Sequence, residues 1–212
     1  MAQGQGTNPP PRHRLPTDTD DGMLVVISGP SGVGKTTITR AVERSIPGTA
    51  FSVSWTTRKP TREDVEGVDY HFVTDAEFEK MKAAGGFLES VDLFDKKYGT
   101  PRRWVEEQLA RGRLVILEID VVGAIKVKKQ MPEAFCVFVL PPGEDALLAR
   151  LRGRKREGED GIQRRFAEAR REITQARSCG IYDKFIVNDV VERATSEAVA
   201  AVTGEIERRR TG

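Results

Sequence analysis

Short apolar runs alternate with amphipathic stretches along most of this chain. The runs are rich in β-branched residues, which indicates buried parallel strands, and helical patterns separate them. This alternation predicts an α/β fold in which helices flank a parallel sheet. The predicted core strands are Met23–Ile27, Leu114–Asp120, Phe135–Leu140 and Phe185–Asn188.

Residues 51–100 have a different pattern, which predicts a small mixed subdomain inserted into this core. Phe51–Trp55 and Val68–Phe72 alternate apolar and polar residues as half-buried strands do, and Phe87–Leu93 is a further predicted strand. Between them, Thr74 and the acid three residues later have capping-box spacing, so a helix should begin there and end at Ala84.

The next predicted helix opens at Pro101, is capped by Thr100 and ends at Gly112. Tyr98-Gly99-Thr100 is then a turn before that helix, and turns of this kind often carry ligand-binding groups.

A glycine-rich motif follows the first predicted strand. Gly29-Pro30-Ser31-Gly32-Val33-Gly34-Lys35-Thr36 fits the pattern G-x-x-x-x-G-K-[ST] and leads into a predicted helix, 36–45. The glycines let backbone N–H groups reach phosphate oxygens, the lysine supplies charge, and the threonine hydroxyl can bind Mg²⁺. We therefore expect a P-loop NTPase-type core that binds a nucleoside triphosphate with Mg²⁺. The alternative is a glycine turn that only precedes a helix.

Polar residues also stand at the carboxyl ends of the later core strands, where parallel sheets bind ligands. Glu118 and Asp120 lie two apart, so on one strand they would share a face and serve Mg²⁺ or its waters. Asn188 ends the last strand. The alternative for either acid is a solvated strand end.

Residues 150–165 are dense in arginine and glycine, which predicts a mobile lid over the transferred phosphate. A solvated basic helix face is the alternative. A nucleic-acid patch is disfavoured because acids at 157, 159 and 160 interrupt the basic residues.

Composition narrows the function classes. The chain has 212 residues, 31% charged, and a net charge of +2, so it is not expected to bind nucleic acid as a whole. It has no apolar run long enough for a membrane span and no secretion signal, and its two cysteines suit a reducing cytoplasm. Residues 1–21 are polar and predicted to be a disordered tail.

Several segments together resemble guanylate kinase, over residues 23 to 208. They are the glycine motif, Phe51-Ser52-Val53-Ser54-Trp55-Thr56-Thr57-Arg58, Gly67-Val68-Asp69-Tyr70-His71-Phe72, Tyr98-Gly99-Thr100, the stretch 150–154, and Ile186-Val187-Asn188-Asp189.

The resemblance implies transfer of the ATP γ-phosphoryl group to GMP, with Mg²⁺ as cofactor and dGMP as a related acceptor. It implies one guanylate-kinase-like domain, 22–212, with a core (22–50, 101–149 and 167–212), a GMP-binding subdomain (51–100) and a lid (150–166). A monomer and a homodimer both remain open.

The resemblance also implies a role for each matched residue. The catalytic charges are Lys35, Arg58, Arg150, Arg154 and Arg165. ATP would contact Gly29, Pro30, Ser31, Gly32, Val33, Gly34, Lys35, Thr36, Thr37 and, at the adenine, Asn188. GMP would contact Ser54, Arg58, Arg62, Tyr70, Glu89, Tyr98, Thr100 and Asp120, with Glu89 and Thr100 at the guanine. The metal would be served by Thr36 and Asp120. From the residues alone, Tyr70 is equally a core residue and Thr100 only a helix cap.

The chain departs from the family pattern at three places. Thr61 stands where the family usually has an arginine, Lys96 and Lys97 precede Tyr98, and Glu118 replaces a common aspartate. The hypotheses that follow are that Arg62, Lys96 or Lys97 restores the charge near the acceptor phosphate.

Two other functions fit parts of the pattern. A kinase acting on another phosphorylated acceptor, such as a ribosyl bisphosphate, would lack the guanine-reading pair. A non-catalytic guanylate-kinase-like binding module would have lost the P-loop glycines or lysine, all of which are present here.

Overall fold

The structure is a computed structural model that describes residues 22–93, 95–153 and 158–211. The predicted tail, 1–21, and Arg154 of the predicted lid lie outside the described residues. Among those described, no helix combines the length and the apolar character that a membrane span requires.

A five-stranded parallel sheet forms the core, in the order β2-β7-β1-β8-β9. This confirms the predicted fold class. The strands are β1 (Met23–Ser28), β2 (Ala50–Phe51), β7 (Leu114–Glu118), β8 (Phe135–Leu140) and β9 (Lys184–Val187).

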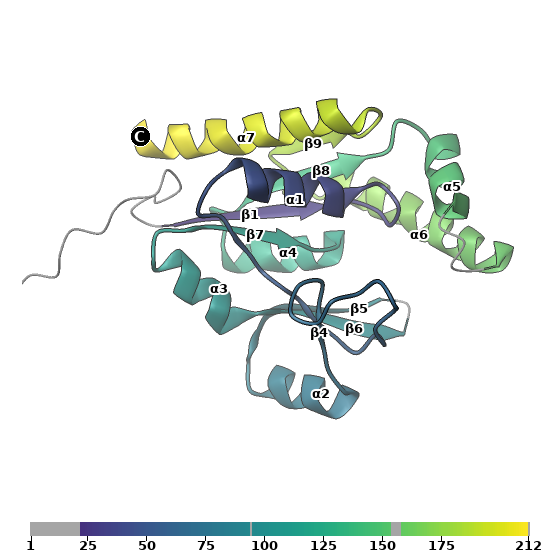
Figure 1. Ribbon diagram of the computed structural model, residues 1–212, viewed down its shortest axis with the longest axis horizontal. Helices are drawn as coiled ribbons and strands as arrows, with labels where there is room; N and C mark the ends of the chain where they lie inside the picture. The colour runs from purple at the N-terminus through teal and green to yellow at the C-terminus, as the bar shows by residue number, and fades with distance from the viewer. Residues whose placement is uncertain (1–21, 94, 154–157, 212) are drawn as a thin grey trace, which may run out of the picture.

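Helices cover both faces of this sheet (Figure 1). One face packs against α1 (Lys35–Ser45) and α7 (Val191–Thr211), and the other against α3 (Arg102–Leu109) and α4 (Val121–Gln130). Two further helices, α5 (Glu144–Gly153) and α6 (Glu159–Ser178), pack against each other beside the carboxyl ends of the strands. Because alternate residues of each strand point to opposite faces, β1 supplies apolar side chains to both.

A second, four-stranded sheet lies below the core in Figure 1, in the order β4-β3-β6-β5. Its elements are β3 (Trp55–Thr56), β4 (His71–Phe72), α2 (Asp75–Ala83), β5 (Phe87–Leu93) and β6 (Lys96–Pro101). The β3–β4 pair is parallel, whereas β6 pairs antiparallel with both β3 and β5. Thr74 caps α2 in a complete capping box, as the spacing predicted.

Three strand predictions were wrong in this region. The predicted strand 51–55 is divided: β2 belongs to the core sheet and β3 to the second sheet, because the chain crosses between them at the buried Ser52. The predicted strand 68–72 is reduced to β4, since Val68 is 49% exposed. Strand β6 was missed, because a sequence rich in lysine, glycine and proline lacks the usual strand composition.

Two residues next to helix starts differ from their predicted positions. Thr100 lies inside β6 and does not cap α3, whose cap position is occupied by Pro101. Asp120 lies beyond β7 and caps α4 instead, so it does not share a strand face with Glu118. The expected helix end at Gly112 comes earlier, at Leu109.

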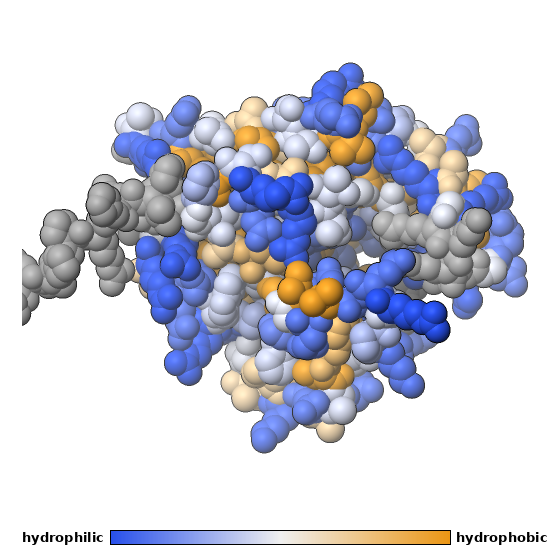
Figure 2. Space-filling view, viewed as in Figure 1, coloured by the Kyte–Doolittle hydropathy of each residue, from blue (hydrophilic) through white to orange (hydrophobic). Residues whose placement is uncertain are grey.

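Charged and polar side chains cover most of the face shown in Figure 2, with apolar groups in patches. Among the described residues, the large apolar side chains that are exposed are Val65, Val68, Val122, Phe185, Val187, Val190 and Val191. Cys136 is buried in the core.

Candidate active site

The glycine motif forms the loop between β1 and α1. Gly34 occupies the cap position of α1 with φ 95°, a left-handed conformation that glycine adopts without strain. The Lys35 ammonium folds back over the loop and donates to the carbonyls of Gly29 at 2.6 Å and Pro30 at 3.1 Å. Thr36 and Thr37 are exposed at the first turn of α1. A helix start with free N–H groups beside a lysine is suited to hold phosphate.

Two side chains from later in the chain hold this loop. The Asn188 amide nitrogen donates to the Val33 carbonyl at 2.7 Å, and Arg150 donates to the same carbonyl at 3.3 Å and to the Asn188 carbonyl at 2.8 Å. Asn188 is only 2% exposed, and its Nδ2 would lie 2.6 Å from a Cβ placed on Gly34. The structure therefore gives Asn188 a supporting contact with the phosphate loop.

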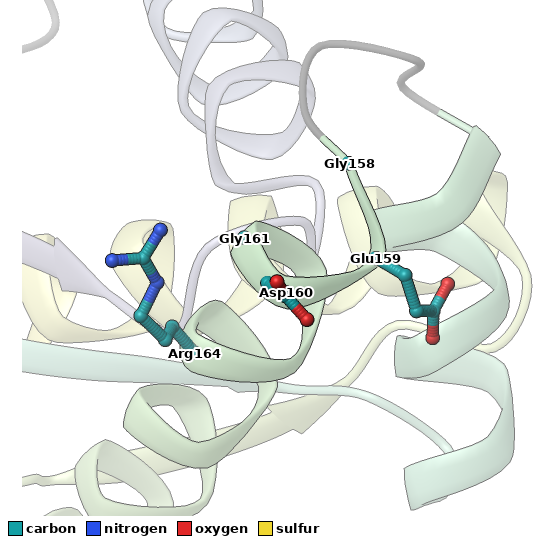
Figure 3. Close-up of a pocket in the computed structure, with 5 residues that line it drawn as sticks. All are labelled: Gly158, Glu159, Asp160, Gly161 and Arg164. Carbon is teal, nitrogen blue, oxygen red and sulfur yellow. The ribbon is translucent and has the colours of Figure 1, made fainter.

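Arg165 of α6 reaches the same loop, where it donates to the Ser31 hydroxyl at 3.3 Å. A separate pocket opens at the first turn of α6, lined by Gly158, Glu159, Asp160, Gly161 and Arg164 (Figure 3). The Glu159 and Arg164 side chains point away from each other there, and Glu159 pairs with Arg152 of α5. This pocket is distinct from the phosphate loop.

Glu118 links the phosphate loop to the second sheet. Its carboxylate accepts a hydrogen bond from the Thr36 hydroxyl at 2.8 Å. Burial raises the pKa of Tyr70 to about 12, and the negative charge of Glu118 adds to that rise. A phosphate bound at Thr36 and a group bound at Tyr70 would thus share one site.

Arg58 and two tyrosines form a cluster on the second sheet. The Tyr70 and Tyr98 rings are 5.8 Å apart, and the Arg58 guanidinium lies 5.0 Å from the Tyr70 ring centre. Both terminal nitrogens of Arg58 donate to the Asp64 carboxylate at 2.9 Å. These hydrogen bonds hold the pKa of Asp64 well below its usual range. Sequence reasoning missed Asp64, because nothing in a polar loop marks which acid will turn back to an arginine.

The remaining acceptor-side residues differ in position. Ser54 is half-buried, and its carbonyl accepts from the His71 backbone. Arg62 is exposed in the 61–64 turn. Lys97 points to α2, where its ammonium pairs with Glu79 at 2.6 Å and Asp75 at 3.6 Å. The Lys97 ammonium, one of the candidates to restore positive charge near the acceptor phosphate, is thus paired with two acids of α2.

Glu89 and Thr100 are register partners on β5 and β6 and are joined directly. The buried Thr100 hydroxyl donates to Glu89 Oε1 at 2.6 Å, whereas Oε2 is buried without a hydrogen-bond partner among the described residues. Burial raises the pKa of Glu89 to about 7, against the lowering effect of the Thr100 hydrogen bond. An acid held in this way is ready to accept hydrogen bonds from a planar ring with two donors.

Asp120 stands between the two halves of the site. Its Oδ1 accepts from the Gly123 N–H at 2.6 Å, at the start of α4. Burial raises its pKa, whereas the Gly123 hydrogen bond and the nearby Lys35 charge lower it. Its charge also raises the pKa of Glu89. Asp120 is therefore close both to the phosphate loop and to the Glu89 pair.

Glu172 of α6 is a further buried acid that sequence reasoning missed. It is 7% exposed, and burial raises its pKa to about 7, with Lys35 lowering it and Asp120 and Glu168 raising it. Its only sequence signal is its position two turns after Arg165 on the same helix, which gives both residues one face.

Comparisons with known proteins agree with this architecture. A family model described as guanylate kinase matches residues 21–204. The guanylate kinase of Symbiobacterium thermophilum is 46% identical over 184 residues, covering 87% of this chain and 86% of that protein. The guanylate kinase of Nocardia farcinica is also 46% identical, over 86% of this chain and 94% of its own length.

Solved structures give the same result. The crystal structure of guanylate kinase from Anaplasma phagocytophilum matches with a TM-score of 0.72 and 29% identity, covering 88% of this chain and 87% of that one. A gluconokinase from Sinorhizobium meliloti shares the fold, at a TM-score of 0.51 and 18% identity. On the family match over nearly its whole length, this chain belongs to the guanylate kinase family.

Proposed function

We propose that this chain transfers the γ-phosphoryl group of ATP to GMP, giving ADP and GDP, at the site between the phosphate loop and the second sheet. The observation that carries the proposal is the placement of Asp120 and Glu118. These acids join a phosphate-binding loop to a buried, half-satisfied carboxylate and an arginine–tyrosine cluster. The family's curated members of similar length support the same reaction.

The donor side is assigned to the loop. ATP phosphates would lie against the N–H groups of 29–37 and the Lys35 ammonium, with Arg150 and Arg165 adding charge from α5 and α6. Arg154 is proposed for the same clamp on the resemblance alone. Asn188 and Arg150 would act by fixing the loop through the Val33 carbonyl.

The acceptor side is assigned to the second sheet. The GMP phosphate would bind Arg58, Tyr70 and Tyr98, with Ser54 and Arg62 nearby. Glu89 Oε2 would accept from the guanine ring and Thr100 would hold the carboxylate in place. Since a site built to hydrogen-bond a donor rejects analogues that lack it, this pair would select guanine over adenine.

The donor set at Thr36 fits Mg²⁺, which prefers oxygen ligands and usually keeps water and substrate phosphate as well. The Thr36 hydroxyl and the Glu118 carboxylate are in contact there, and Asp120 is the second acid near Lys35. When bound with ATP, Mg²⁺ neutralises charge on the transferred phosphoryl group. The chain's own groups would position both phosphates in line and stabilise the charge that spreads in the transition state.

The experiment is to measure initial rates of ADP formation from ATP and Mg²⁺ with GMP, AMP, CMP or UMP as acceptor. Strong stimulation by GMP is expected. Stimulation by none of the four, with ATP still bound, would overturn the proposal in favour of another acceptor or a binding module.

A further inference from the structure

Gly123 is the third residue of α4 and lies beside both acids of the acceptor site. Its N–H donates to Asp120 Oδ1 at 2.6 Å. It is buried and is not among the glycines with positive φ, so its backbone conformation is one that any residue adopts. The requirement at this position is therefore one of space.

Carboxylate oxygens occupy that space. A Cβ on Gly123 would lie 2.9 Å from Glu89 Oε2, 3.2 Å from the Glu89 carboxyl carbon and 3.1 Å from Asp120 Oδ1. These approaches are shorter than ordinary van der Waals contacts. The three nearest atoms belong to side chains and none to the backbone, so a methyl group could be accommodated by shifting the acids while α4 stays in place.

The atom that would move first is the one proposed to read the guanine. Glu89 Oε1 is fixed by Thr100 at 2.6 Å, so the carboxylate can leave the methyl group only by rotating or by breaking that bond. Either movement displaces Oε2, which has no other hydrogen bond among the described residues. Helix propensity favours alanine over glycine inside α4, so the local backbone gains nothing from glycine here.

We infer that Gly123 is a positioning residue for acceptor selection. Because it has no Cβ, it leaves room for the Glu89 carboxylate to lie beside Asp120 in the orientation that receives the guanine ring. This inference rests on the proposed function. If the role of Gly123 were only structural, its replacement by alanine would reduce GMP recognition and protein stability together. The inference instead predicts weaker GMP recognition with the stability of α4 unchanged.

The chain provides a matched control. Gly204 lies inside helix α7, and a Cβ placed on it meets nothing within 4 Å. Both G123A and G204A replace a helical glycine by alanine, so both receive the same gain in helix propensity. Only G123A places a methyl group against Glu89 and Asp120.

The experiment measures KM for GMP and for ATP in wild type, G123A and G204A, with thermal unfolding of each and GMP affinity by calorimetry. G123A should raise KM and Kd for GMP roughly tenfold or more, the factor expected on losing a hydrogen bond to a charged acceptor, and leave KM for ATP within about twofold. G204A should match wild type for both substrates. An unchanged GMP constant in G123A, or equal losses for both substrates, would overturn the inference.

A double-mutant cycle with E89Q tests the route of the effect. If Gly123 acts through the Glu89 carboxylate, G123A adds little further loss of GMP affinity in the E89Q background. Additive losses would show that it acts elsewhere and overturn the inference. Should G123A fail to fold, G123A/E89D, with a shorter acid, should restore the fold; a double variant that also fails would count against the inference. Absence of GMP-dependent turnover in wild type and G204A would instead refute the proposed function.

Discussion

Replacing Glu172 by glutamine should stabilise this protein, and by an amount that depends on pH. The side chain is 7% exposed, and no hydrogen bond or ion pair joins its carboxylate to the described residues. Burial is the main cause that raises its pKa from 4.5 to about 7; the Lys35 charge lowers it, and the charges of Asp120 and Glu168 raise it. Ionised Glu172 therefore costs folding free energy, because the unfolded chain solvates the charge better.

The sign and size follow from linkage. Between pH 4.5 and about 7 the native state keeps a proton that the unfolded state has lost, so stability falls as pH rises through this window. A pKa shift of this size lowers the free energy of unfolding by roughly 3 kcal/mol above pH 7 and by less than about 1 kcal/mol at pH 5. Glutamine is neutral at both pH values and avoids the cost.

The assay is urea unfolding of wild type and E172Q at pH 5 and pH 8, with the free energy of unfolding taken from each curve. We expect E172Q to exceed wild type by roughly 3 kcal/mol at pH 8, equivalent to a Tm increase of about 6–12 °C for a domain of this size. Glu207→Gln, at an exposed position of α7, is the control and should change stability little. A gain for E172Q that is the same at both pH values, or no gain, would refute the reasoning.

Three further predictions concern the site. Lys35→Ala should lower kcat by roughly 100-fold or more at unchanged unfolding temperature, because charge stabilisation in the transition state is lost; a kcat near wild type would contradict its role. Asp64→Asn should raise KM for GMP several-fold and leave KM for ATP unchanged, because the bidentate hold on Arg58 is broken; equal KM values to wild type would show that Arg58 needs no such support. The KM for GMP should fall as pH rises to about 7 and then level off, because only ionised Glu89 accepts both guanine donors; Glu89→Gln should flatten that profile and reduce the preference for GMP over AMP, and an unaltered profile would exclude Glu89 as the titrating group.

Much of the core could be predicted from the sequence. The strands β1, β5 and β8, the glycine loop and the capping box of α2 are each encoded within a few consecutive residues, so local pattern was enough. Residues 50–56 and 96–101 could not be assigned in this way. Ser52 is buried because the chain passes between two sheets there, and β6 exists because β3 and β5 lie on either side to pair with it.

The same distinction between local pattern and tertiary packing applies to the residues of the site. The sequence by itself determined the phosphate loop, the fold class and the family, because these depend on residue types at fixed local spacing. Only the tertiary structure decided that Glu118 contacts Thr36, that Asp120 caps α4, that Asp64 holds Arg58 and that Gly123 leaves room for Glu89. The Glu118–Thr36 contact and the approach of Gly123 to Glu89 join groups far apart in the sequence, whose proximity comes from packing; the physical reason is that burial and charge act through space rather than along the chain.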